Sequence, residues 1–262
     1  MGFRQLFLPV IPLRELGRLT WVEVRELLRR GVDTVILPVG TVEPHGPHLP
    51  LGTDAIIPEV IARELAERID ALVMPTIYYG VTRGLHGYPG SVRVEPDTLE
   101  RLVYETLSSM AMHGFKYAII LNGHGGREQV KALERAAYKL WVERGMAVAI
   151  VDWWTLARER GVTEKVLGKE GGHAGTDETA MVYAANPSLV KEKLYDSGEI
   201  VVHTGGLRSF PLPGTIINYS PEEGDVKFDP EAFEKYFEEV VATVEEEVKA
   251  FLYRARKLLG DD

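Results

Sequence analysis

The sequence predicts an α/β fold: a mostly parallel central sheet with helices on both of its faces. Short apolar segments rich in Val, Ile and Leu alternate along the chain with longer segments in which apolar residues recur at helical spacing. This alternation is typical of βαβ units, whose strands are parallel and whose helices cover the sheet. The 262 residues, 45% of them hydrophobic, suffice to bury one sizeable core, so we expect a single domain over residues 1–262.

Local signals place the individual elements. Thr20 and Glu23 form a capping box, which predicts a helix that ends before Gly31. Elsewhere, apolar runs predict strands, and apolar residues at helical spacing between glycines or prolines predict helices. We expect strands at residues 34–39, 71–74, 116–121 and 146–151, and helices at residues 55–68, 95–113, 127–143, 179–185 and 229–259. A charged linker is expected before Gly171, and a short β-like piece within residues 207–218.

Composition excludes several classes of function. The formal net charge of −9 argues against a nucleic-acid partner and against an anionic membrane surface. The chain has no cysteine, so a metal site has to use histidine and carboxylate ligands. Only three Asn and two Gln occur, and depletion of these thermolabile residues predicts a thermophile protein.

Nothing in the sequence predicts a membrane protein or an exported one. No apolar run reaches the roughly 20 residues that span a bilayer. Residues 1–12 contain a short apolar patch, but prolines interrupt it and no small-residue cleavage site follows. We therefore expect a soluble, cytoplasmic protein.

Metal-ligating side chains follow two of the predicted strands. Glu43, His45 and Asp54 lie in a connection rich in proline and glycine after residues 34–39, and His124 directly follows residues 116–121. In parallel sheets the carboxyl ends of the strands open into one crevice, so these four side chains are expected to meet there. Glu43 and His45 are two residues apart and, in an extended segment, point the same way.

Two of these residues have simpler interpretations. Asp54 stands at the entry to a helix, where Asp is a favoured N-cap. A short stiff carboxylate that bridges two ions is the alternative, which Glu43 and His45 favour. His124 lies in Gly-His-Gly-Gly, which resembles a phosphate cradle at a helix N-terminus, but the motif lacks the spacing of known phosphate loops. We therefore interpret His124 as a ligand.

A third junction of glycine, histidine and acid occurs at residues 173–178, His-Ala-Gly-Thr-Asp-Glu. His173 and Glu178 are candidates here, although acids in a first helical turn also stabilise the helix dipole. Other polar residues, His48, Glu59 and His86, are interpreted as structural residues or as partners that orient a ligand. The remaining histidines, His113 and His203, lie in segments without such a pattern.

Three motifs together resemble the creatininase (creatinine amidohydrolase) family. They are residues 37–54 (Leu-Pro-Val-Gly-Thr-Val-Glu-Pro-His-Gly-Pro-His-Leu-Pro-Leu-Gly-Thr-Asp), residues 122–126 (Asn-Gly-His-Gly-Gly) and residues 173–179 (His-Ala-Gly-Thr-Asp-Glu-Thr). The likeness covers roughly residues 34–185, with the motifs in the family's order. It implies a three-layer α/β/α fold, two divalent metal ions (zinc, manganese or iron) and a homo-oligomer, commonly a hexamer.

The resemblance also implies residue roles. Glu43 and His124 bind one metal ion, His45 binds the other and Asp54 bridges both. Glu178 completes the second ion's ligands, and His173 acts near the scissile C–N bond. Two ions that share a water lower its pKa, so that a bridging hydroxide attacks the carbonyl carbon, and an imidazole is suited to protonate the departing nitrogen.

The sequence departs from the creatininases proper at groups that grip creatinine. Their aromatic and acidic residues after the second metal-site histidine are replaced here by Gly125 and Gly126, and the acid before His173 by Gly172. No tryptophan precedes His173 closely. Candidate contacts for a small-molecule substrate are Ser91, Arg127, Trp153 and Trp154, although Arg127 also suits a helix surface and the tryptophans a sheet edge.

We therefore expect a metal-dependent amidohydrolase that cleaves a non-peptide C–N bond, in a creatinine-like cyclic amide or a formamide. One alternative is a deformylase of a phosphorylated pyrimidine intermediate of archaeal flavin or deazaflavin biosynthesis, which Arg127 would suit. A metal-dependent small-molecule binding protein without turnover is the non-enzyme alternative. The combination of Asp54, His173 and Glu178 argues against it, because binding alone needs neither a bridging acid nor a proton donor.

Overall fold

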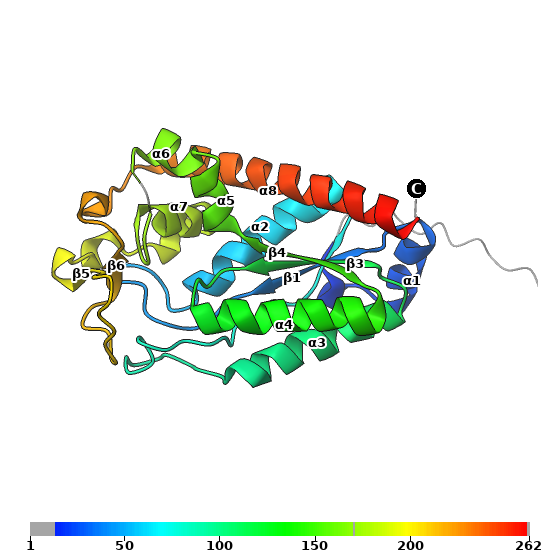
Figure 1. Cartoon of the computed structure of the whole chain (residues 1–262). Helices are drawn as coiled ribbons and strands as arrows, with labels where there is room; N and C mark the ends of the chain where they lie inside the picture. Colours follow the sequence, from blue (N-terminus) through cyan, green and yellow to red (C-terminus); the bar gives the residue numbers. More distant parts are fainter. Residues whose placement is uncertain (1–13, 170, 261–262) are drawn as a thin grey trace, which may run out of the picture.

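The computed structural model describes residues 14–169 and 171–260 (Figure 1). The apolar patch that bears on targeting, residues 1–12, lies outside these ranges. Within them, no helix combines the length and the apolar character needed to cross a membrane.

Four parallel strands form the central sheet, in the order β2-β1-β3-β4. Their bounds are β1 Thr34–Val39, β2 Leu72–Val73, β3 Tyr117–Asn122 and β4 Ala147–Asp152. The long helices are α1 Trp21–Arg29, α2 Thr53–Ile69, α3 Pro96–Met112, α4 Arg127–Arg144, α7 Thr176–Ala185 and α8 Pro230–Leu259. Shorter elements are helices α5 Trp153–Glu159 and α6 Val162–Leu167 and the strand pair β5 Ile200–Val202 and β6 Ile216–Asn218.

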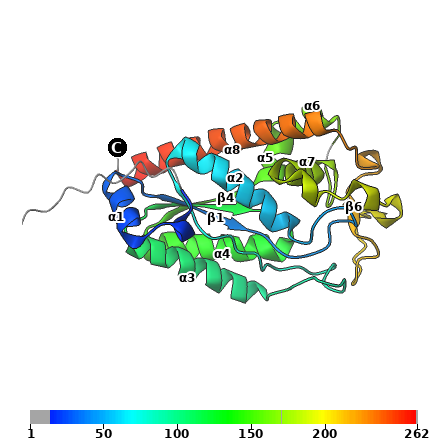
Figure 2. The same cartoon turned by 180° about the vertical axis from the view of Figure 1, so that it is seen from behind.

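Alternate residues of the strands face two separate cores. Ile36 of β1 and Ile119 of β3 belong to the core on one face, which α2, α7 and α8 cover; Leu37 and Ile120 belong to the other, which α1, α3 and α4 cover. Figures 1 and 2 show the sheet between these two helical layers from opposite sides. The predicted α/β fold with three layers and a mostly parallel sheet is thus confirmed.

The register of the strands places the start of each connection at the same edge of the sheet. Val39 pairs with Asn122, and Asn122 pairs with Asp152, so the last residues of β1, β3 and β4 lie side by side. Strands β1 and β3 then lead into polar connections, and β4 leads directly into helix α5. The crevice expected at the carboxyl ends of the strands therefore has three walls that start from neighbouring strands.

The prediction of a charged linker before Gly171 is wrong in part. Trp153 begins α5 and Val162 begins α6, so most of this segment is helical. Both helices are too short for their apolar spacing to stand out in a charged sequence, and their stability comes from packing on α8. Strand β5 was also not expected, whereas β6 falls inside the predicted β-like piece.

Candidate metal centre

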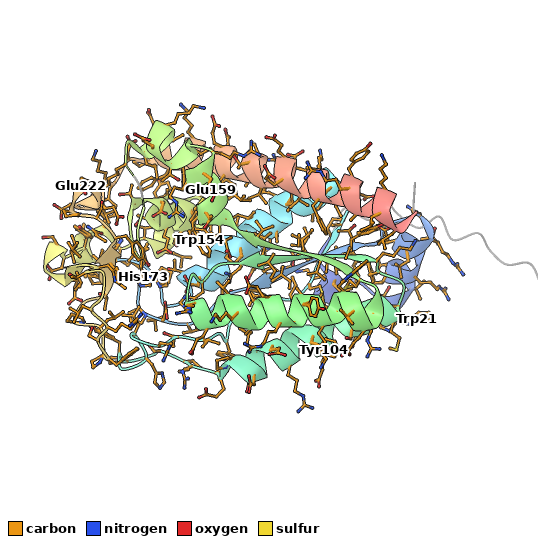
Figure 3. The ribbon with its side chains drawn as sticks, in the orientation of Figure 1. Trp21, Tyr104, Trp154, Glu159, His173 and Glu222 are labelled. Carbon is orange, nitrogen blue, oxygen red and sulfur yellow. The ribbon has the colours of Figure 1, made fainter. Side chains whose placement is uncertain are left out.

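A cleft of about 470 Å³ opens at the carboxyl ends of the sheet strands. Its floor contains Glu43, Asp54, His124, His173 and Glu178, which come from the three motifs of the sequence. Figure 3 shows His173 and Trp154 at this end of the molecule, opposite Trp21. The topology therefore gathers residues that are far apart in the chain.

Two glycines allow the start of α2 to enter between the strand ends. A Cβ atom on Gly40, after β1, would lie 2.2 Å from the Asp54 carbonyl oxygen, and one on Gly123, after β3, would lie 1.8 Å from it. Any side chain at either position would push the first turn of α2 away. This close approach carries Asp54 to a position between the ligands that follow β1 and the histidine that follows β3.

The N-cap interpretation of Asp54 is wrong. Gly52 is the N-cap of α2, and Asp54 lies in the first helical turn with its side chain turned into the site. Its Oδ1 is 2.8 Å from Nε2 of His45, and its Oδ2 is 3.0 Å from Nδ1 of His124. One carboxylate thus faces two histidines through different oxygens, as a bridging ligand does.

The ring of His45 is fixed by the backbone. Its Nδ1 lies 3.0 Å from the Glu43 carbonyl oxygen, to which it donates, so Nε2 is the nitrogen that faces Asp54. The same Nε2 is 3.7 Å from Oε2 of Glu178. A histidine held by its other nitrogen in this way is a typical metal ligand.

A buried network of amides shapes the loop that carries His124. The Asn122 side chain donates to the His124 carbonyl (2.9 Å) and accepts from the His124 amide (3.2 Å). Gln129 donates to the same Asn122 oxygen. These bonds hold the Gly-His-Gly-Gly turn open, so that His124 Nδ1 lies 3.3 Å from Glu43 Oε1.

Glu178 is held by a turn with an unusual backbone conformation. Ala174 has a φ of +58°, which L-residues other than glycine adopt only at some energetic cost. In this conformation its N–H donates to Oε2 of Glu178 at 2.6 Å. The turn therefore fixes the carboxylate that reaches His45.

His173 stacks against His45, with ring centroids 4.1 Å apart. Its Nε2 donates to the Pro44 carbonyl oxygen at 2.8 Å, so its Nδ1 is the nitrogen without a hydrogen. That Nδ1 is 3.9 Å from Glu43 Oε1. His173 thus borders the cluster with an unprotonated nitrogen that faces Glu43.

Charges inside this buried cluster are strongly coupled. Burial raises the pKa of Glu43, and it raises the pKa of Glu178 to about 8. Burial opposes the charged form of His45 too, but the Asp54 and Glu178 carboxylates outweigh it and raise its pKa to about 10. The carboxylates of Glu43 and Asp54 likewise outweigh burial at His124 and raise its pKa to about 9, so imidazolium groups balance the charge of the acids in this cluster.

The residues present fit divalent metal ions. Three groups have ligand atoms within 4.8 Å of one another: Glu43, Asp54 and His124; His45, Asp54 and Glu178; and Glu43, His45 and His173. Nitrogen and carboxylate donors without thiolates suit zinc, manganese or iron. Because these groups contain no lysine or arginine, a metal ion would supply the balancing positive charge when the histidines bind it in their neutral form.

Among the expected substrate contacts, only Trp154 lies among the described residues that line the cleft. Trp153 is fully buried in the core. Ser91 donates to the Leu85 carbonyl within its own loop, and Arg127 lies exposed outside the cleft lining. These three residues therefore lie outside the described cleft lining, and their role as substrate contacts stays a prediction. Successive residues of helix α5 point in different directions, so Trp153 enters the core while Trp154 borders the cleft.

Sequence reasoning missed several residues of the cleft. Thr82 donates a hydrogen bond to Oε2 of Glu43, and Arg83, Arg158 and Tyr219 line the walls. No local motif marks them.

The glycine that replaces the acid before His173 has a physical reason. A Cβ on Gly172 would lie 2.5 Å from the Ile217 carbonyl oxygen and 2.6 Å from Oε2 of Glu223.

His48 is structural, as expected, and connects two of the motifs. Its Nε2 lies 3.1 Å from Oγ1 of Thr179, whose own hydrogen is donated to the Gly175 carbonyl. The Thr179 oxygen therefore accepts, and His48 is neutral with its hydrogen on Nε2. Burial, aided by the charge on His45, lowers the pKa of His48 to about 4.

This neutral histidine should make the protein sensitive to acid. An unfolded histidine has a pKa of about 6.5, so between pH 6.5 and 4 the unfolded chain binds a proton that the folded chain does not. Stability therefore falls as the pH is lowered through this window, by up to about 3 kcal/mol. We expect His48→Gln, whose amide still donates to Thr179, to lose this part of the dependence when unfolding free energies are measured by urea titration at pH 7 and pH 4.5. Equal pH dependence in the two proteins would contradict the assignment.

Comparison with known proteins agrees with this geometry. The family model "Creatininase: Creatinine amidohydrolase" matches residues 17–248. The creatinine amidohydrolase of Pseudomonas putida is 29% identical over 188 residues, which cover 66% of this chain and 72% of that protein. The mycofactocin precursor peptide peptidase of Mycolicibacterium smegmatis is 33% identical over 165 residues, 61% of this chain and 60% of the relative, so the match spans less than two thirds of that protein.

Solved structures give the same result. A mutant creatininase of the Zn-Zn type superposes with a TM-score of 0.73 at 25% identity, covering 91% of this chain and 98% of the other. A manganese creatininase superposes with a TM-score of 0.71 at 25% identity and the same coverage. These metals agree with the donor set described above. With the family model matching most of its length, this chain belongs to the creatininase family.

Proposed function

We propose that this protein is a metal-dependent amidohydrolase that cleaves a non-peptide C–N bond, in a creatinine-like cyclic amide or a formamide. The observation that carries the proposal is the position of Asp54, whose two oxygens face His45 and His124 separately. A carboxylate placed in this way suits two neighbouring cations. The matching structures of zinc and manganese creatininases support a divalent metal.

Two ions would share Asp54 and divide the other ligands between them. Glu43 and His124 would hold one ion, and His45 and Glu178 the other. When bound, such ions polarise a carbonyl group and lower the pKa of water towards neutrality. Thr82 holds the second oxygen of Glu43, which leaves Oε1 directed at the site.

His173 is proposed to move the proton. Its Nδ1 is free because Nε2 donates to the Pro44 carbonyl, and the ring lies against His45 at the edge of the cluster. Burial, aided by the charge on His45, lowers the pKa of His173 to about 3, so Nδ1 is unprotonated and would take a proton from the attacking water and pass it to the departing nitrogen. Trp154 offers an aromatic wall for a planar substrate.

One other activity has specific support. A deformylase of a 5′-monophosphate from Methanothermobacter thermautotrophicus is 32% identical over 151 residues, 55% of each chain. Deformylation of a phosphorylated pyrimidine uses the same chemistry on a formamide. The proposed function and this alternative therefore differ in substrate and agree in mechanism.

Hydrolysis assays on the metal-loaded protein test the proposal. We expect turnover of simple formamides or cyclic amides and none of a blocked dipeptide, because Trp154 offers its face to a planar group beside the metal centre. Turnover of creatinine would assign the stacking role to Trp154, since Trp153 is buried. Cleavage of the peptide alone would contradict the non-peptide assignment. Inactivity on the whole panel would favour the binding protein without turnover.

A further inference from the structure

Of one wall of the cleft, the proposed function uses only Trp154. Helix α5 contributes Trp154, Thr155 and Arg158 to the lining. Trp154 and Arg158 are four residues apart, so they lie on the same face of the helix. An aromatic surface and a guanidinium thus border the same space.

Arg158 is a cation without a described partner. Among the described lining residues, Arg83 and Arg158 are the two arginines, and no lysine accompanies them. Arg83 is committed, because it pairs with Glu128 at 3.1 Å and its guanidinium lies over the Phe210 ring at 5.3 Å. Within the described part of the chain, no carboxylate lies within ion-pair distance of Arg158.

Among the described residues, charged groups near Arg158 have partners, unlike Arg158 itself. Arg160, two residues further on, pairs with Glu247 and Glu246 of α8 on the outside of the molecule. Two cleft acids near this wall already have partners: Asp152 accepts from Asn122 at 2.7 Å, and Glu128 pairs with Arg83. Arg158 is therefore available to a ligand in the cleft.

We propose that Arg158 binds an anionic group of the substrate, a carboxylate or a phosphate, while the scissile amide lies at the metal centre. This inference rests on the proposed function and specifies its substrate class. A guanidinium offers parallel N–H donors that match the oxygens of either anion. The role expected of Arg127 from the sequence thus passes to a different arginine, on α5.

Matched substrates test the inference. N-formylglycine and N-formylglycinamide differ in one negative charge, and formylaminomethylphosphonate replaces the carboxylate with a phosphorus oxyanion. For Arg158→Gln, we expect kcat/KM to fall about tenfold to a hundredfold on the two anionic substrates and to change less than threefold on the neutral amide. Arg160→Gln is the control and should change neither. The better anionic substrate of the wild type identifies which anion the site takes.

Two results would overturn the proposal: an equal loss on charged and neutral substrates, or no loss on the charged ones. If neither formamides nor cyclic amides are hydrolysed, the proposed function fails, but Arg158 is still tested by calorimetric titration of the metal-loaded protein with inorganic phosphate. A dissociation constant at least tenfold weaker in Arg158→Gln than in the wild type and Arg160→Gln supports the anion site. Equal constants, or no binding to the wild type, overturn it.

Discussion

Asp54→Ala is expected to release both metal ions and to abolish hydrolysis. The carboxylate faces His45 through one oxygen and His124 through the other, so its removal takes one ligand from each proposed ion. It also leaves two buried imidazoles without their closest negative charge. We expect less than half of an ion per chain after dialysis, measured by inductively coupled plasma mass spectrometry, and a loss of kcat of at least about a thousandfold.

Glu59→Gln provides the control for this change. Glu59 lies on the same helix, α2, but its carboxylate accepts hydrogen bonds from Thr76, Tyr78 and Arg63 outside the cleft. It should keep its metal and its activity. Circular dichroism of both variants separates loss of metal from loss of fold. Two retained ions per chain in Asp54→Ala would show that the bridging assignment is wrong.

The sequence predicts the fold and most of the metal cluster because both depend on short-range patterns. Strand β1 and the capping box of α1 match the prediction residue by residue, since an apolar run and a Thr-x-x-Glu spacing are local signals. Glu43, His45, Asp54 and His124 come together because parallel topology alone brings strand ends to one crevice.

Other features depend on contacts between distant segments. Whether Asp54 is a cap or a ligand is decided by Gly40 and Gly123, which admit the first turn of α2 between two strands. That Arg158 lines the cleft while Arg127 does not follows from the orientation of α5, a helix that packing on α8 stabilises. No pattern within either segment contains this information.

Replacement of His173 should separate catalysis from metal binding. We expect His173→Ala to keep the metal content of the wild type, because Glu43, His45, Asp54, His124 and Glu178 remain. Its kcat should fall about a hundredfold to ten thousandfold, the usual contribution of a group that moves a proton in the transition state. Metal analysis and steady-state kinetics on the same samples check both parts.

The structure makes the metal measurement decisive. His173 Nδ1 is 3.9 Å from Glu43 Oε1, and the Glu43, His45 and His173 side chains also form a group close enough to hold an ion. Removal of a proton carrier lowers the rate and keeps the metal content, whereas removal of a ligand lowers the metal content. Loss of one ion in His173→Ala would make this histidine a ligand. If His173→Ala keeps its ions but is slow, imidazole is added to the assay. Partial recovery of the rate would support proton transfer at Nδ1, because free imidazole can replace the missing base although the Pro44 carbonyl does not hold it as it holds His173.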